Sequence, residues 1–344
     1  APTPGTGSRY LDGGVAHESK ALSVLPVRDT LVLSGRRGVG ETVLDATVSS
    51  RSLAGYADPR IAGYLAPLAR GALRDEPSAR ILAGLGHDEI APFARALEVA
   101  GGEETLAGAL AYALGAGKDA TLRDAMRFAA KRHALAREYA RDFEVTRELA
   151  RPALLTSLSR ADSARGALVQ AYLEVLSEVP DLDVAARAGR QEAEEVSRMA
   201  HGVLKAGGVH SRRGLEGIAN LGGLLRADPR LSPTTTEYPV IAAAFLVALE
   251  YGPDALSHRL RPAPGGGSRS PGPHYRLVES GETIGEEEEH EGPGHRGTRF
   301  APQRRFEPAR LRARRPHQGD RRVRRGRRVL LERGALHAPR ARHP

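Results

Sequence analysis

The chain has 344 residues, of which 51 are Lys or Arg and 42 are Asp or Glu, and it contains no cysteine. The absence of cysteine excludes a disulfide scaffold, a thiolate metal site, an iron–sulfur cluster and a thiol nucleophile. The whole net charge of +9 lies after residue 261, because residues 262–344 hold 19 Arg, no Lys and 10 acidic residues. The basic isoelectric point therefore arises from the C-terminal segment and does not indicate a nucleic-acid-binding domain.

Residues 1–25 carry neither the charged start nor the apolar run of a signal peptide, and we expect a poorly ordered leader there. The longest apolar run, residues 240–249, is about half of the ~20 residues that a membrane helix needs. We interpret it as a buried core helix and expect no membrane contact. The default compartment is then the cytoplasm.

Residues 26–261 are expected to form an all-α fold, built as a single multi-helix domain. Aromatic residues make up only 4% of the chain, so small and aliphatic side chains must form the core, which favours packed helices. One short run, Thr30–Ser34, resembles a strand, and one strand cannot make a sheet. Apolar residues recur at helical spacing over residues 39–51, 59–72, 87–100, 103–115, 122–143, 147–159, 162–177, a segment from Asp181 or Asp183 to Gly207, 212–226 and 237–251.

Beyond residue 261 this periodicity disappears. The segment contains PAPGGGSRSPGP, four consecutive glutamates from Glu286, and RRVRRGRR at 321–328. Such a composition buries too little apolar surface to offset its ordering entropy, so we expect residues 262–344 to be a disordered basic tail. Its arginines could make weak, non-specific contacts with nucleic-acid phosphates and no base readout.

Two local features suggest chemistry without establishing it. The stretch from Gly35 to Thr42 resembles a phosphate-binding P-loop, but Glu41 stands where the lysine belongs, so a loop before a helix is the favoured interpretation. His133 lies on an apolar stripe, which is more typical of a partly buried core histidine than of a catalytic base. No set of His, Asp and Glu has the spacing of a metal site made of protein ligands alone.

Several sequence segments of the helical region, taken in their order along the chain, point to a family. TLRDAMRFAAKRHALAREYARDF (121–143), VPDLDVAARAG (179–189), EEVSRMAHGVLKAGG (194–208) and SPTTTEYPVIAAAFLVAL (232–249) occur in this order. Together with GVGETVLDAT and GYADPRIAGYLAPLARGA upstream, they resemble the triphosphoribosyl-dephospho-CoA synthase family over about residues 35–255. The similarity is strongest between residues 121 and 208.

The resemblance implies an all-α transferase that joins ATP to dephospho-CoA, or to a related ribosyl acceptor. The acceptor's ribose 2′-hydroxyl attacks C1′ of the ATP ribose, and adenine leaves. Such a glycosyl transfer needs carboxylates near an oxocarbenium-like centre, and cations with Mg²⁺ around the triphosphate. The expected partners are therefore ATP, Mg²⁺ and dephospho-CoA.

Matching positions supply the candidate site residues. Asp181 and Arg187 stand where the family pattern has its Asp and Arg, so the resemblance implies a catalytic or Mg²⁺-side carboxylate and a phosphate ligand. A plain helix cap with an Asp183–Arg187 pair is an equal alternative. The family's Asn-Thr-His motif is replaced by a stretch with Asp58 and Arg60, and its Pro-Gly-x-x-Ala-Asp motif by one with Thr235, Thr236 and Glu237.

These departures leave two functions open for the helical region. In the first, Asp58, Asp181 and Glu237 are catalytic carboxylates, and Arg60, Arg187, Thr235 and Thr236 bind the nucleotide. In the second, the chain is a helical nucleotide-binding homologue without turnover. A third function, nucleic-acid contact, would belong to the tail alone.

Overall fold

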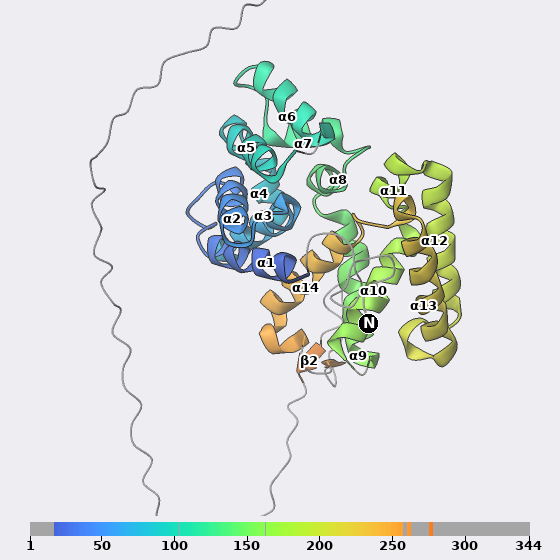
Figure 1. Ribbon diagram of the computed structural model, residues 1–344. Coiled ribbons are helices and arrows are strands. Elements are labelled where there is room, and N and C mark those ends of the chain that lie inside the picture. Colours follow the sequence, from blue (N-terminus) through green and yellow to red (C-terminus); the bar gives the residue numbers. More distant parts are fainter. Residues whose placement is uncertain (1–16, 103, 162, 257–259, 263–274, 278–344) are drawn as a thin grey trace, which may run out of the picture. The chain divides into compact units, whose positions relative to one another are not determined.

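The computed structural model describes residues 17–102, 104–161, 163–256, 260–262 and 275–277 (Figure 1). Within them the regular secondary structure is helical apart from one pair of short strands, which confirms the all-α expectation. The helices are α1 (His17–Leu31), α2 (Val39–Ala54), α3 (Pro59–Arg74), α4 (Ser78–Ala83), η1 (His87–Glu89), α5 (Ile90–Ala100), α6 (Glu104–Gly115), α7 (Leu122–Ala129), α8 (Ala134–Ala140), η2 (Val145–Ala150), α9 (Arg151–Arg160), α10 (Ala164–Glu178), α11 (Leu182–Arg187), α12 (Arg190–Lys205), η3 (Gly208–His210), α13 (Arg212–Ala227), η4 (Pro229–Leu231), α14 (Glu237–Tyr251) and η5 (Pro253–Leu256).

Most expected helices are confirmed close to their expected ends, and in the structure capping side chains stand where several of them begin. Asp58, Ser163 and Ser211 each accept a backbone N–H from the first turn of the helix that follows. These three caps start α3, α10 and α13. The segment expected as 147–159 is in fact two elements, the π-helix η2 and the α-helix α9.

Two long expected helices are each broken in the middle. The segment 122–143 divides into α7 and α8, with His133 in an extended conformation as the N-cap of α8. The segment after Asp181 divides into α11 and α12 at Gly189, whose φ of 114° belongs to the region that favours glycine. Apolar spacing continues across both breaks, which is why periodicity alone predicted single helices.

Helix α1 replaces two features that the sequence analysis expected. It covers the start of the expected strand at Thr30–Ser34 and the last part of the leader expected over residues 1–25. Leu31 is the last residue of this helix, and Val27 and Leu31 are both buried at the i, i+4 spacing of one helical face. The Thr30 hydroxyl donates to the Val27 carbonyl at 2.9 Å. Helix and turn hydrogen bonds therefore satisfy the backbone of the strand-like run, and residues 17–25 of the expected leader belong to a helix.

The basic tail expected from residue 262 lies almost wholly outside the described residues. The exceptions are β1 (Leu260–Pro262) and β2 (Tyr275–Leu277), which pair antiparallel with Leu260 opposite Leu277. A short hairpin-like pairing was not expected in this segment.

Two hydrophobic clusters form the core, and α14 belongs to both. The first gathers side chains from α1 to α8, and Tyr238 and Ala242 of α14 complete it. The second gathers side chains from η2 to α13, with Val240, Ala243 and Val247 of the same helix. The expectation of a buried core helix at 240–249 is thus confirmed, and the described helices include none with the length and apolar character to cross a membrane.

Candidate active site

Asp58 and Arg60 form a closed ion pair at the start of α3. Asp58 Oδ1 accepts the Arg60 backbone N–H at 3.1 Å, and the Arg60 guanidinium returns to the same carboxylate at 3.0 and 3.1 Å. The Tyr238 hydroxyl, from the first turn of α14, donates to Asp58 Oδ2. Burial alone would raise the pKa of Asp58, but the Arg60 charge and these hydrogen bonds outweigh it and hold the pKa below its usual value.

Asp181 ties the start of α11 to the segment that precedes α14. Its Oδ1 accepts the backbone N–H groups of Asp183 at 3.0 Å and Val184 at 3.1 Å. Its Oδ2 accepts the N–H and the hydroxyl of Thr235, both at 2.8 Å, and those of Thr236 at 3.0 and 2.9 Å. Asp181 is only 2% exposed. Six donors therefore enclose a carboxylate that solvent barely reaches.

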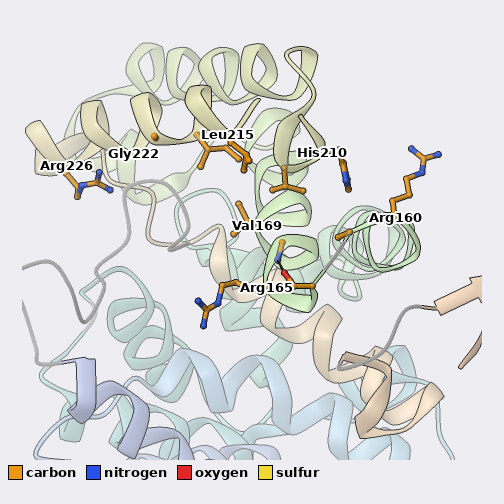
Figure 2. Close-up of a pocket in the computed structure, with 13 residues that line it drawn as sticks. Arg160, Arg165, Val169, His210, Leu215, Gly222 and Arg226 are labelled. Atoms are coloured by element: carbon orange, nitrogen blue, oxygen red, sulfur yellow. Dashed lines mark hydrogen bonds between the residues drawn. The ribbon is translucent and has the colours of Figure 1, made fainter. Parts of the chain in front are cut away.

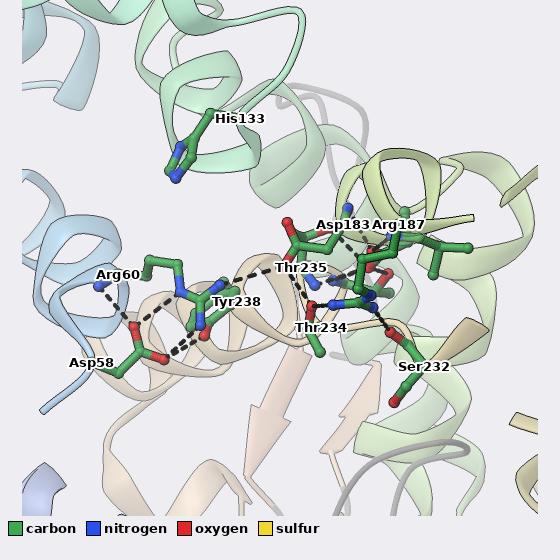
Figure 3. Close-up of polar contacts among 12 residues, drawn as sticks. Asp58, Arg60, His133, Asp183, Arg187, Ser232, Thr234, Thr235 and Tyr238 are labelled. Carbon is green, nitrogen blue, oxygen red and sulfur yellow. Dashed lines mark hydrogen bonds and ion pairs between the residues drawn. The ribbon is translucent and has the colours of Figure 1, made fainter. Parts of the chain in front are cut away.

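Asp183 links this segment to α3 and keeps part of its carboxylate open. Its Oδ2 accepts the Thr234 hydroxyl and lies 3.5 Å from Arg60 Nη1. The side chain is 34% exposed. Figure 3 shows how Asp58, Arg60, Asp183 and Thr234 connect α3, α11 and the start of α14 through one polar network.

Arg187 is turned toward the backbone of the same segment. Its guanidinium donates to the Ser232 carbonyl, and it lies 3.4 Å from the Arg230 carbonyl and 3.5 Å from the Thr234 hydroxyl. These contacts hold residues 230–234 against the end of α11. The resemblance assigns Arg187 to phosphate binding, whereas in the structure its guanidinium contacts backbone carbonyl groups.

A cavity of about 340 Å³ opens beside this network. Arg60, Tyr64, Asp183, Thr235 and Tyr238 line one side, and Arg132 and His133 from the turn before α8 line the other. The remaining lining residues are Glu104, Thr105, Ala134, Leu135 and Ala186. Arginine, histidine, hydroxyl and carboxylate groups therefore converge on one space, which lies between elements from both core clusters.

His133 does not have the expected place inside the core. Its Nδ1 accepts the Ala136 backbone N–H at 3.3 Å, so the ring caps α8 and stands on the cavity wall. In Figure 3 the ring lies across from Arg60 and Tyr238. The break before α8, hidden by continuing periodicity, puts Arg132 and His133 at the site.

Tyr64 lines the cavity and carries a buried hydroxyl. The residue is 1% exposed, and its ring is stacked on Tyr238 at 5.6 Å and meets Phe143 edge-on at 6.2 Å between centroids. Among the described residues its hydroxyl has no hydrogen-bond partner. Burial raises the pKa of Tyr64 well above its usual value, so the group stays a neutral donor. Sequence analysis missed this residue because it lies inside a regular apolar face of α3.

Glu237 begins α14 next to Tyr238, but it is not among the described residues that line the cavity. Burial raises its pKa above the usual range, and the nearby Asp58 carboxylate adds to the effect. Lys20 and Arg60 act in the opposite direction and do not cancel it.

The glycine-rich stretch before α2 already holds an acidic side chain. The buried Glu89 carboxylate accepts the Gly40 backbone N–H at 2.6 Å and lies 3.6 Å from Arg70. A Cβ on Gly40 would approach the Glu89 carbonyl oxygen to 2.3 Å. Glu89 therefore occupies the helix N-terminus that a phosphate would need, which agrees with interpreting this stretch as a loop before a helix.

No group of three or more His, Asp or Glu side chains with metal-binding geometry occurs in the described ranges. The acidic side chains on the cavity wall are Glu104 and Asp183.

The comparisons with known proteins agree on one family. Residues 25–255 match the family model described as ATP:dephospho-CoA triphosphoribosyl transferase. A search of curated proteins found no match. Among solved structures, the chain is similar to a protein from Archaeoglobus fulgidus that is provisionally assigned as a triphosphoribosyl-dephospho-CoA synthase. The identity is 20%, the TM-score is 0.50, and the match covers 68% of this chain and 98% of that one.

At this identity the structural match supports the fold alone, while the family model covers most of the chain and includes every candidate site residue. The chain therefore belongs to the ATP:dephospho-CoA triphosphoribosyl transferase family.

Proposed function

We propose that the cavity beside Arg60 and Asp183 binds the ribose triphosphate part of ATP and transfers it to the 2′-hydroxyl of dephospho-CoA. The observation that carries this proposal is the gathering of Arg60, Arg132, His133 and Asp183 around one cavity in a chain of this family. A volume of about 340 Å³ suits the reacting part of the substrates, and the rest of each substrate extends outward.

The reaction breaks the bond between C1′ and the adenine nitrogen and forms a bond between C1′ and the acceptor oxygen. The hydroxyl loses a proton and adenine gains one, so no further reactant is consumed. Positive charge develops at C1′ as adenine departs, and a carboxylate near that atom stabilises it more than it stabilises the ground state.

Asp183 is the carboxylate that best suits this role. It faces the cavity and is partly exposed, and its Oδ1 receives no hydrogen bond from the described residues. We assign it to receive the hydroxyl proton or to stabilise C1′. Asp58 and Asp181, by contrast, have both oxygens engaged in hydrogen bonds and would act as positioning residues.

The basic wall would hold the triphosphate. Arg132 and His133 come from the turn before α8, and Arg60 comes from α3, so phosphate oxygens between them would bridge two elements. Arg60 is preorganised by Asp58 and lies over the Tyr238 ring at 4.6 Å. Arg187, Thr235 and Thr236 fix the segment before α14. Although Thr235 lines the cavity, its N–H and hydroxyl already donate to Asp181, so we assign none of the three a hydrogen bond to the nucleotide.

Mg²⁺ would enter with the triphosphate. The cation is commonly held by one or two carboxylates together with phosphate oxygens and water. The Glu104 carboxylate on the cavity wall matches this requirement without a dedicated cluster, and Asp183 then remains available for the reaction at C1′. Bound there, Mg²⁺ would neutralise phosphate charge.

Incubation of the purified chain with ATP, Mg²⁺ and dephospho-CoA tests the proposal. Chromatography should detect free adenine, and mass spectrometry should detect the joined product. The Asp183→Asn variant, compared at equal folded fraction, should release adenine at least about a hundredfold more slowly. ATP binding without adenine release in the wild type would contradict the transferase proposal.

A further inference from the structure

A second cavity, of about 750 Å³, lies in the half of the helical region that contains α9, α10 and α13 (Figure 2). It shares no described lining residue with the 340 Å³ cavity. Its walls come from the end of α9, the first turns of α10, η3 and α13. Neither the family resemblance nor the transferase reaction accounts for it.

The floor of this cavity is aliphatic. Val169 of α10 and Ile218 of α13 are buried beneath it, and Leu215 of α13 faces it although 52% of that residue is exposed. A Cβ on Gly222 would lie 3.0 Å from the Arg226 guanidinium, so the missing side chain lets Arg226 fold back along α13 at the cavity. No Phe or Tyr occurs among the described lining residues, so the cavity lacks the aromatic face on which a nucleobase would stack. An aliphatic chain suits it better.

The rim is basic. Arg165 and Arg226 reach toward one end, and Arg160 and His210 stand at the other (Figure 2). In the described part of the chain, no ion pair joins any of these three arginines to an acidic side chain. Nearby arginines of the same half of the molecule do have partners: Arg151 with Glu250, Arg190 with Glu194, Arg198 with Glu195 and Arg212 with Glu216.

The acidic group near this rim is already engaged. Glu174 lies close enough to Arg160 and His210 for both to act on its pKa, although burial dominates and raises that pKa. Its Oε1 accepts the Gln170 side chain at 3.1 Å, and Gln170 Oε1 in turn accepts the Val209 N–H at 3.1 Å. These contacts fix η3, which carries His210, against α10. This wall of the cavity is therefore held in place by hydrogen bonds.

We propose that this cavity binds an amphipathic anion, with an aliphatic chain on Val169, Leu215 and Ile218 and a phosphate or carboxylate head on the surrounding arginines. Apolar burial would supply affinity, and the arginines would select the head group. The proposal stands on this cavity alone and does not depend on the transferase reaction.

Calorimetric titration of the full chain with decyl phosphate, below the concentration at which it aggregates, tests the proposal. Saturable binding at one site per chain is expected, with decanoate binding in the same way and decyltrimethylammonium not binding. Gly222→Leu should fill the cavity and abolish binding. Gly223→Leu is the matched control, because a Cβ on Gly223 meets nothing within 4 Å.

The arginines are tested by a second pair of variants. The double substitution Arg165→Ala with Arg226→Ala should weaken binding at least about tenfold. Arg190→Ala with Arg212→Ala removes two surface arginines outside the cavity and should leave affinity unchanged. Equal binding in the Gly222 and Gly223 variants, or in the two arginine pairs, would overturn the proposal.

Competition with dephospho-CoA separates two sources of the anion. Dephospho-CoA also joins phosphates to an aliphatic arm, so its displacement of decyl phosphate would assign the cavity to the acceptor and overturn a separate site. Undiminished decyl phosphate binding in the presence of saturating dephospho-CoA is the expected result.

Discussion

Tyr64 and Tyr139 are both buried, with at most 1% of either residue exposed. Of their two hydroxyls, only that of Tyr139 has a hydrogen-bond partner among the described residues, because it donates to the Gly63 carbonyl at 2.7 Å. The Tyr64 hydroxyl has no partner in the described part of the chain, and Tyr64 is one of the residues that line the cavity. A buried unsatisfied polar group lowers stability. Its presence on a cavity wall is the expected signature of a group that is satisfied by a ligand.

The first prediction compares these two tyrosines. Tyr64→Phe should leave the melting temperature unchanged or raise it and should lower kcat/KM about tenfold, because a substrate hydrogen bond is lost. Tyr139→Phe leaves the Gly63 carbonyl unpaired and should cost about 1–2 kcal/mol of stability with little effect on kcat/KM. If Tyr64→Phe is destabilising and fully active, the hydroxyl has no ligand role.

The second prediction concerns Asp181. Asp181→Asn places an amide near the Thr235 and Thr236 donors and removes charge-assisted hydrogen bonds, so it should lower the free energy of unfolding by about 2–4 kcal/mol. Asp183→Asn changes a partly exposed group and should cost less than about 1 kcal/mol. Urea titration at neutral pH measures both. Equal stabilities would show that Asp181 does not hold α11 to the Thr235 segment.

The third prediction is a pH dependence that originates at Asp58. Its pKa in the folded chain is below the ordinary value of 3.8, so the folded state binds this proton less readily than the unfolded state. The stabilisation is complete above pH 3.8 and is lost as the pH falls through the lower, folded pKa. In the Asp58→Asn variant, the free energy of unfolding measured by urea titration should therefore fall less steeply as the pH decreases from about 4 to 2.5. An unchanged acid slope would argue against the Arg60 pair.

The fourth prediction has the opposite sign. The pKa of Glu237 is raised above the ordinary 4.5, so ionising it in the folded chain costs stability as the pH rises through that range. Glu237→Gln should raise the melting temperature at pH 7 more than at pH 4. Because Glu237 does not line the cavity, the variant should keep its adenine release. A large loss of activity at unchanged stability would instead support the catalytic role expected from the sequence.

Local signals in the sequence predicted the helices well and their interruptions poorly. The helix cap considered at Asp181 is present, because its carboxylate accepts the Asp183 and Val184 N–H groups at the start of α11. The break at His133 leaves the apolar spacing intact, and only the three-dimensional path reveals it. Helix α1 was missed because its apolar pattern is weak and its end resembles a strand.

The candidate site was predicted residue by residue but not as an arrangement. Asp181 lies 54 positions from Thr235 and Tyr238 lies 180 from Asp58, and no local pattern encodes such contacts. The family resemblance named Asp181 and Arg187 as candidates, and both contact the segment before α14, while their roles in the reaction stay predictions. It could not reveal that donors saturate Asp181, or that Asp183, Tyr64 and Arg132 face the cavity.

The most direct test of this account is the rate of adenine release from ATP with Mg²⁺ and dephospho-CoA, measured for the wild type and for Asp183→Asn. The account predicts adenine and joined product in equal amounts for the wild type, and a rate at least about a hundredfold lower for the variant, with a melting temperature lowered by at most about 4 °C. Wild-type adenine release no higher than in a protein-free control, or equal rates in the two proteins, would contradict it.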